Sequence, residues 1–165
     1  MKTLLILRHA KTQPDAPRGD WERQLTERGE RDAATMGHLI ASLPDLPDAV
    51  VTSDAVRARQ TAEIVVEAAG LFAPVTLEPR IYAAEWRSLL DVVRGLPDEA
   101  ACALIIGHNP GFEELAAALA EGNAVVDHLP TAGLVYLDLD AATWRDVRPG
   151  GGTLRAVHTP KEHRP

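Results

Sequence analysis

The chain has 165 residues, of which 45% are apolar and 4% aromatic, and its formal net charge is −7. This length fits one compact domain with a mainly aliphatic core, and the acidic balance argues against nucleic-acid partners, which require a basic surface. Every apolar run falls well short of the roughly 18 residues that cross a membrane, and a single cysteine excludes an internal disulfide. We therefore expect a cytoplasmic protein that binds neither nucleic acid nor membranes.

Short apolar runs and helical apolar stripes alternate along the chain. Continuous apolar runs are typical of buried strands, whereas apolar residues spaced three and four apart indicate helices. Residues 10–24 are polar and contain proline and glycine, which predicts a loop. The predicted strands are residues 3–7, 49–52, 75–77, 103–106, 134–139, 144–147 and 153–157. Four helices are predicted: one begins after residue 26, one begins after residue 53, and the other two cover residues 86–96 and 112–119.

Several residues mark the ends of these helices. Thr26 is placed to cap the first helix, because its hydroxyl can accept from a backbone N–H of the first turn. Pro44 and Pro47 end that helix, since proline lacks the N–H that a helix interior needs. Ser53 is predicted to cap the second helix, and Gly70 to close it.

The alternation of strands and helices predicts an α/β fold. We expect a three-layer α/β/α sandwich with a largely parallel central sheet. Residues 1–158 are predicted to form a single domain, and residues 159–165 a frayed C-terminal tail.

Polar residues stand directly after three of the predicted strands. The pairs are Arg8-His9, Thr52-Ser53 and Gly107-His108. In parallel sheets, ligands bind beyond the carboxyl ends of the strands, so these pairs converge on one rim. Arg57 and Arg59 fall in the first turns of the second helix, where a helix N-terminus and arginine forks both attract anions. The rim therefore predicts a site for a compact anion such as a phosphoryl group.

The composition of this rim favours metal-free phosphoryl chemistry. The chain lacks the glycine pattern of a nucleotide-binding loop, and the strand ends lack the carboxylate cluster of a metal phosphatase. We accordingly expect no cofactor, no metal ligands, and activity in excess chelator. A neutral imidazole can instead attack phosphorus and form a covalent intermediate, while positive donors stabilise the transferred oxygens.

Three segments resemble, in the same order, the motifs of the histidine phosphatase superfamily, also called phosphoglycerate mutase-like. The sequence Arg-His-Ala-Lys at residues 8–11, the segment at residues 23–29 and the compact length resemble its small SixA-type phosphohistidine phosphatases; Ala10 stands where the wider superfamily has glycine. The three segments are Leu7-Arg8-His9-Ala10-Lys11, Ser53-Asp54-Ala55-Val56-Arg57-Ala58-Arg59-Gln60-Thr61-Ala62 and Gly107-His108-Asn109-Pro110-Gly111.

This resemblance implies a role for each matched residue. His9 would be the nucleophile, Arg8 and Arg57 would bind the phosphate, and His108 would be a further phosphate donor. It also implies a general acid in larger relatives, for which Glu85 is the candidate here.

Other residues receive weaker assignments. Thr12 and Asn109 are candidates for shaping the substrate pocket, whereas Arg59 is expected to be a surface or ion-pair residue. Cys102 lies in an apolar run and is expected in the core. Four further histidines show no ligand spacing with each other and are interpreted as surface or structural: His38, His128, His158 and His163.

Four functions compete. The first is a phosphatase that hydrolyses protein phosphohistidine or a small phosphoramidate, releasing inorganic phosphate. The second is a phosphomonoesterase or mutase that acts on a small phosphorylated metabolite. The third is a phosphate-binding module without turnover, and the fourth is a purely structural domain. Because few residues separate the predicted third strand from the next helix, we expect an open pocket without a lid, which favours a phosphorylated side chain on another protein.

Overall fold

The computed structural model describes residues 1–122 and 126–165. Within them, six strands form one sheet in the order β3-β2-β4-β1-β5-β6. The strands β1 to β4 pair in parallel, whereas β5 runs antiparallel to both of its neighbours. The largely parallel sheet is therefore confirmed. The strands are β1 (Lys2–Arg8), β2 (Ala49–Thr52), β3 (Val75–Leu77), β4 (Cys102–Gly107), β5 (Leu134–Leu139) and β6 (Gly152–His158).

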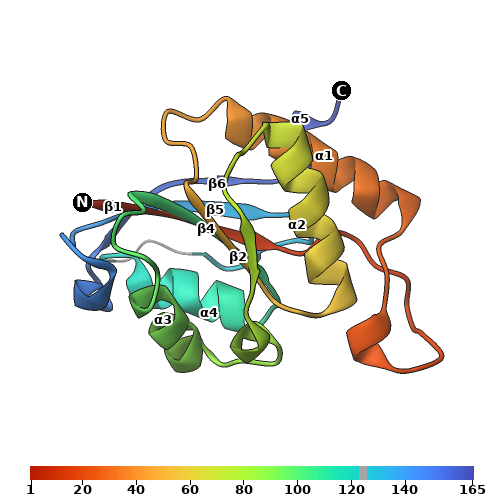
Figure 1. Ribbon diagram of the computed structural model, residues 1–165, viewed down its shortest axis with the longest axis horizontal. Coiled ribbons are helices and arrows are strands. Elements are labelled where there is room, and N and C mark those ends of the chain that lie inside the picture. Colours follow the sequence, from red (N-terminus) through yellow and green to blue (C-terminus); the bar gives the residue numbers. More distant parts are fainter. Residues whose placement is uncertain (123–125) are drawn as a thin grey trace.

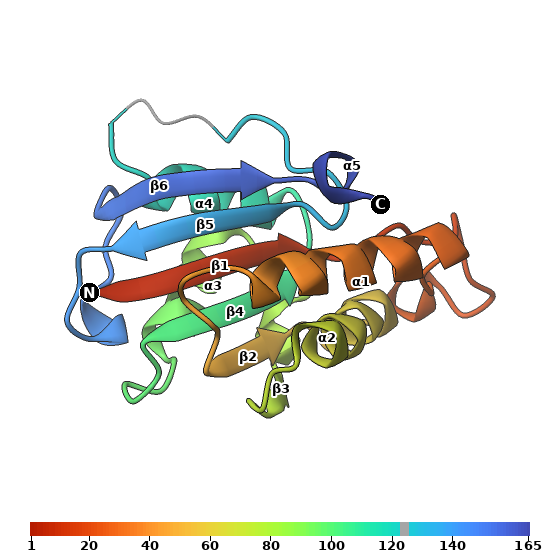
Figure 2. The ribbon, with the colours of Figure 1, turned by 90° about the horizontal axis from the view of Figure 1, so that it is seen from above.

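Helices cover both faces of the sheet, as the three-layer prediction requires. The helices α1, α2 and the short α5 lie on one face, and α3 and α4 lie on the other (Figures 1 and 2). Their bounds are α1 (Glu27–Ala41), α2 (Val56–Ala69), α3 (Trp86–Arg94), α4 (Gly111–Leu119) and α5 (Pro160–His163), with 3₁₀ turns at Asp20–Glu22, Pro79–Ile81 and Trp144–Asp146.

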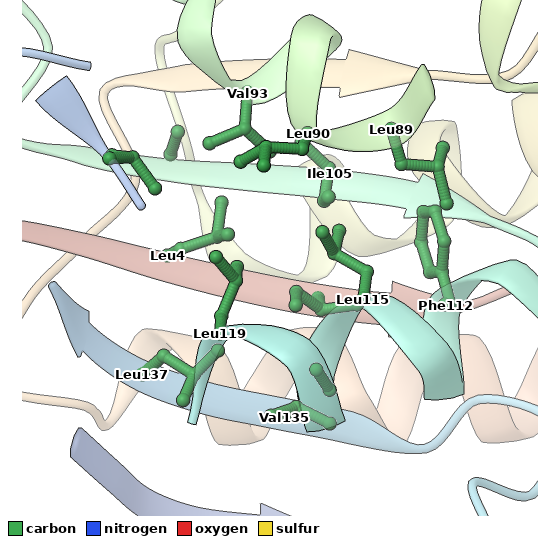
Figure 3. Packing of buried hydrophobic residues seen from close by; sticks show 14 of the residues in the cluster. Leu4, Leu89, Leu90, Val93, Ile105, Phe112, Leu115, Leu119, Val135 and Leu137 are labelled. Atoms are coloured by element: carbon green, nitrogen blue, oxygen red, sulfur yellow. The ribbon is translucent and has the colours of Figure 1, made fainter. Parts of the chain in front are cut away.

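Alternate side chains of the central strands fill two separate cores, because successive residues of a strand point to opposite faces. Leu4 and Ile6 of β1 pack toward α3 and α4, where Phe112 is fully buried (Figure 3). Leu5 and Leu7 pack on the opposite side, against the inner faces of α1 and α2. The sheet is thus packed between two layers of helices, which fixes the positions of the residues at the carboxyl ends of its strands.

Two of the predicted helix caps are confirmed. The Thr26 hydroxyl accepts a hydrogen bond from the Gly29 N–H at 3.0 Å, and Gly70 ends α2 in the left-handed conformation with φ 66°. The prediction for Ser53 is wrong, since α2 begins at Val56 and its N-cap is Ala55. The Ser53 hydroxyl instead accepts from the Ala55 N–H at 3.2 Å in the turn that precedes the helix.

The predicted strand at residues 144–147 is also wrong. Trp144 begins a 3₁₀ turn there, and both Trp144 and Val147 are almost fully buried. Residues three apart face the same side of a 3₁₀ turn, so both side chains can be buried although the segment is not a strand. The indole N–H of Trp144 donates to the Ala100 carbonyl at 2.9 Å, which satisfies its polar atom in the core.

The C-terminal residues are ordered against α1, which corrects the expectation of a frayed tail at residues 159–165. Pro160–His163 form α5. Arg164 then donates two hydrogen bonds to the buried carboxylate of Asp32 in α1, at 3.0 and 3.1 Å. A buried carboxylate needs a charged partner, so this bidentate pair fixes the end of the chain.

Across residues 1–122 and 126–165, no helix is both long and apolar enough to cross a membrane.

Candidate active site

A pocket of about 770 Å³ opens at the carboxyl edge of the parallel strands. Arg8 and His9 reach it from the end of β1, His108 from the end of β4, and Arg57 from the first turn of α2. Residues from the 10–24 loop and from the connection between β3 and α3 complete its wall. The predicted convergence of strand ends on one rim is thus what the fold produces.

His9 is buried at the base of this pocket, with 6% of its surface exposed. Its Nδ1 lies 2.8 Å from the Ala10 carbonyl oxygen. Because a carbonyl oxygen only accepts hydrogen bonds, Nδ1 must carry the proton, and Nε2 keeps a free lone pair. Burial lowers the pKa of His9 to about 3, so the ring is neutral near neutral pH. His9 therefore has the tautomer and charge of a nitrogen nucleophile.

Hydrogen bonds to two other segments hold the backbone around His9. The His9 N–H donates to the Gly107 carbonyl at 2.9 Å, and the Ala10 N–H donates to the Thr61 hydroxyl at 3.1 Å. That hydroxyl in turn donates to the Arg57 carbonyl at 2.8 Å. Thr61, within the second sequence motif, thus links the histidine loop to the helix that carries Arg57.

His108 faces His9 across the pocket, with ring centroids 5.3 Å apart. Its Nε2 lies 2.8 Å from the Ser53 hydroxyl oxygen, while its Nδ1 is buried without a hydrogen-bond partner among the described residues. Burial, with a smaller contribution from Arg57, lowers the pKa of His108 to about 4. The ring is therefore a neutral group with one unpaired nitrogen.

Arg8 and Arg57 supply the positive charge of the pocket. Arg8 donates from Nη1 to the Leu129 carbonyl at 3.0 Å, and burial lowers the pKa of its guanidinium. Arg57 is 5% exposed. The Nε atoms of both side chains are buried without partners in the described part of the chain. Buried donors without partners are rare in proteins, so this pair is suited to binding an oxyanion.

Asp20 is a charged pocket residue that the motifs did not indicate. Its carboxylate accepts from Arg57 Nη2 at 2.9 Å and from the Tyr82 hydroxyl at 2.7 Å, and its backbone carbonyl accepts from Arg57 Nη1 at 2.7 Å. The hydrogen bond from Tyr82, with further contributions from Arg23 and Arg57, holds the pKa of Asp20 well below its usual range. Asp20 is therefore ionised and paired with the pocket arginine.

All six predicted site residues line the pocket, namely Arg8, His9, Thr12, Arg57, His108 and Asn109. Asn109 donates to the Leu129 carbonyl at 2.9 Å, and the Thr12 hydroxyl accepts from Arg23. Arg59 lies outside the pocket, with its guanidinium over the Trp21 ring at 5.4 Å, as expected for a structural residue.

Glu85 does not take part in the pocket. Its carboxylate caps α3 by accepting from the Ser88 N–H at 3.1 Å, and its side chain is 55% exposed. The prediction that Glu85 is a candidate general acid therefore lacks geometric support. Asp20 is the one carboxylate that lines the pocket within residues 1–122 and 126–165, and its lowered pKa makes it a poor acid.

Two features outside the site also bear on the predictions. Cys102 is buried, and burial raises the pKa of its thiol to about 12, as expected of a core cysteine. Two of the four histidines that were interpreted as surface or structural, His158 and His163, come together with Glu162 near the C-terminus.

Comparison with known proteins assigns the family. The profile of the histidine phosphatase superfamily (branch 1) matches residues 4–90, more than half of the chain. The uncharacterized protein Rv1276c of Mycobacterium tuberculosis is 33% identical over 164 residues, which cover 94% of this chain and 100% of that protein. The chain belongs to the histidine phosphatase superfamily.

Solved structures share the whole fold. The protein assigned as phosphohistidine phosphatase SixA in Nakamurella multipartitia is 27% identical and superposes with a TM-score of 0.86, over 96% of each chain. The tungstate complex of the protein histidine phosphatase SixA is 23% identical, with a TM-score of 0.83, and covers 97% of this chain and 98% of that one. The predicted resemblance to the SixA group is confirmed at the level of structure.

Proposed function

We propose that this protein is a phosphatase that works through a phosphohistidine intermediate on His9, and that its substrate is phosphohistidine on another protein. The observation that carries the proposal is the state of His9. Its ring is neutral, its Nδ1 proton is held by the Ala10 carbonyl, and its free Nε2 belongs to a pocket that also contains Arg8, Arg57 and His108. A nitrogen lone pair beside clustered positive donors is suited to attack on phosphorus.

The proposed reaction has two transfers. In the first, a bond forms between His9 Nε2 and phosphorus while the bond between phosphorus and the substrate imidazole breaks. The substrate ring is protonated on the nitrogen that does not carry the phosphoryl group, so it leaves as neutral imidazole. In the second, water attacks the phosphorus, the bond to Nε2 breaks, and inorganic phosphate is released with His9 restored. Arg8, Arg57 and His108 bind the phosphoryl oxygens in both transfers.

The charge state of the pocket favours a phosphoramidate over an ester. An alkyl ester must expel an alkoxide or receive a proton from a general acid. Asp20 is ionised, and Glu85 lies outside the pocket. Phosphohistidine avoids this need, because nucleophile and leaving group are both imidazoles and the first transfer is nearly balanced in free energy. SixA, a structural neighbour, forms a complex with tungstate, and binding of this oxyanion by a protein of the same fold adds support for a phosphoryl substrate.

A comparison of turnover rates tests this substrate class. The substrates are a phosphohistidine protein, free phosphohistidine, an aryl phosphate and several sugar phosphates. We expect the highest kcat/KM with the phosphohistidine protein, and we expect Glu85→Gln to leave that rate within about tenfold, because general-acid help is worth 10²–10⁴ where it is used. If a sugar phosphate is turned over faster than the phosphohistidine protein, the alternative function of a phosphatase for small metabolites replaces this proposal.

A further inference from the structure

Resting on the proposed function, we infer that Asp20 and Tyr82 are positioning residues that hold the Arg57 guanidinium for the phosphoryl group. The contacts around Arg57 are the basis of this inference. Asp20 binds both terminal nitrogens of Arg57, one through its backbone carbonyl and one through its carboxylate, at 2.7 and 2.9 Å. Two-point binding of a planar guanidinium fixes both its place and its plane.

Asp20 is itself fixed from two further sides. The Tyr82 hydroxyl donates to the same carboxylate oxygen that Arg57 contacts, and Arg23 donates to the other oxygen at 2.9 Å. The Tyr82 ring also lies 5.9 Å from the Arg57 guanidinium and 5.5 Å from the His108 ring, which it meets edge-on. Tyr82 thus contacts the carboxylate, the arginine and the second histidine together.

Asp20 occupies only some of the N–H donors of the Arg57 guanidinium. A guanidinium has five N–H donors, and Asp20 occupies one on each terminal nitrogen. The Nε donor is buried and unpaired within the described residues. Asp20 therefore holds Arg57 by its terminal nitrogens while Nε and the remaining donors stay free for an oxyanion. Holding a charged donor in place before reaction is the kind of preorganisation that lowers a phosphoryl-transfer barrier.

The first test measures oxyanion binding directly, so that it does not depend on turnover. We compare vanadate affinity by calorimetry for wild type, Asp20→Ala, Asp20→Asn and Tyr82→Phe, with Glu22→Gln in the same 3₁₀ turn as the control. We expect Asp20→Ala to weaken binding about tenfold or more, Asp20→Asn to weaken it less because the amide oxygen still accepts, and Glu22→Gln to match wild type. Tighter vanadate binding by Asp20→Asn would instead identify Asp20 as a residue that blocks the pocket and would overturn the inference.

A double-mutant cycle separates positioning from a general structural effect. If Asp20 acts through Arg57, then Asp20→Asn should have little further effect on vanadate affinity in an Arg57→Ala background. Equal losses in both backgrounds would contradict the inference.

The pH profile of kcat gives a second readout. If Asp20 is a positioning residue, Asp20→Asn lowers kcat but keeps both limbs of the pH profile. Loss of a limb in Asp20→Asn would instead make Asp20 a proton donor or acceptor. If vanadate binding changes as expected but the wild-type protein has no phosphatase activity, then the proposed function is wrong and the positioning role of Asp20 still stands.

A separate observation at the C-terminus leads us to infer a zinc site formed by His158, Glu162 and His163. His163 Nε2 lies 3.2 Å from His158 Nδ1, and one ligand atom from each of the three side chains lies within 4.8 Å of the others. Two imidazole nitrogens on a tetrahedral zinc ion, with bonds of 2.0–2.1 Å, are about 3.3 Å apart. The two rings thus already have the spacing of zinc ligands.

The backbone holds these ligands in place. His158 ends β6, and the other two residues belong to α5, which the bidentate pair between Arg164 and Asp32 fixes against α1. That pair also neutralises the arginine next to His163. Two imidazoles and one carboxylate are a donor set that zinc accepts, with water as a fourth ligand.

Calorimetric titration of zinc chloride into chelator-treated protein tests this site. We expect one bound ion, at least about tenfold weaker binding in His158→Ala and His163→Ala, and wild-type binding in His128→Ala, which removes an exposed histidine elsewhere. Zinc should also raise the Tm of wild type but not of His163→Ala. Absence of zinc binding, or equal binding in wild type and His163→Ala, would mean that the two rings only hydrogen-bond to each other.

Discussion

At the scale of single residues, the central feature is a histidine kept neutral by burial. In water an imidazole is half protonated near pH 6.5, and a protonated ring has no lone pair for attack. Burial lowers the pKa of His9 to about 3 and that of His108 to about 4. The same burial that keeps the His9 ring neutral also makes the stability of the fold sensitive to acid.

This sensitivity gives a prediction for acid stability. The unfolded chain binds a proton at His9 near pH 6.5, whereas the native protein binds it only near pH 3, so stability falls as the pH falls between these values. We expect this group alone to cost about 2 kcal/mol between pH 6.5 and 5. Urea unfolding at both pH values should show a smaller loss for His9→Gln than for wild type, and an unchanged loss for His38→Gln. Equal losses in all three proteins would contradict the shifted pKa.

Arg57 and His108, two of the side chains that the proposed mechanism assigns to phosphate binding, give a second prediction at this scale. We expect Arg57→Ala and His108→Ala each to lower kcat/KM by about 10² or more, the effect of losing a donor that stabilises developing charge. Inorganic phosphate and vanadate should compete with substrate in the wild type, and should compete less well in both variants. Steady-state inhibition kinetics measure both effects. Two variants that stay near wild type would remove these residues from the proposed mechanism.

At the scale of elements, the carboxyl edge of the sheet explains which site residues the sequence could reveal. Arg8 ends β1, His9 and His108 directly follow β1 and β4, and Arg57 stands in the first turn of α2. Apolar periodicity gives the approximate positions of these strands and of this helix, which is enough to place the four residues on one rim. Asp20 and Tyr82 belong to irregular connections whose course depends on tertiary hydrogen bonds. Periodicity carries no information about such contacts.

The same reason explains the elements that were predicted wrongly. Trp144 and Val147 are buried in a 3₁₀ turn because of their three-residue spacing, which a short apolar segment does not distinguish from a strand. The ordering of α5 depends on Arg164 reaching Asp32, which is 132 residues away in the chain. Pairings over that distance leave no local pattern, so the C-terminal residues looked like a free tail.

The packing of α1 against the loop after His9 gives a prediction at the element scale. A Cβ at Gly29 would lie 2.1 Å from the Lys11 carbonyl oxygen, so any side chain there must push α1 away from the loop that follows His9. We expect Gly29→Ala to lower the free energy of unfolding by about 1–3 kcal/mol and to lower kcat. Gly95→Ala is the control, because its Cβ would meet its nearest neighbour at an ordinary 3.5 Å. Similar stability of the two variants in urea would contradict this role of the close contact.

At the scale of the whole molecule, the chain combines an acidic surface with a small basic pocket. The net charge is −7, yet the pocket is lined by Arg8, Lys11, Arg23 and Arg57 against the single carboxylate of Asp20 among the described residues. Such a local concentration of positive charge attracts a phosphorylated group while the remaining surface repels polyanions. The fold brings these charged side chains together at the carboxyl ends of the strands.

The central claim is that His9 carries the phosphoryl group between the two transfers, and trapping the intermediate tests it most directly. Wild-type protein is mixed with a phosphohistidine substrate, quenched in alkali within the first turnover, and mapped by mass spectrometry. We predict an acid-labile phosphoryl group on His9 in wild type, and neither this group nor turnover in His9→Ala. A phosphoryl group found on another residue, or a His9→Ala variant that keeps more than about a tenth of the wild-type rate, would contradict the account.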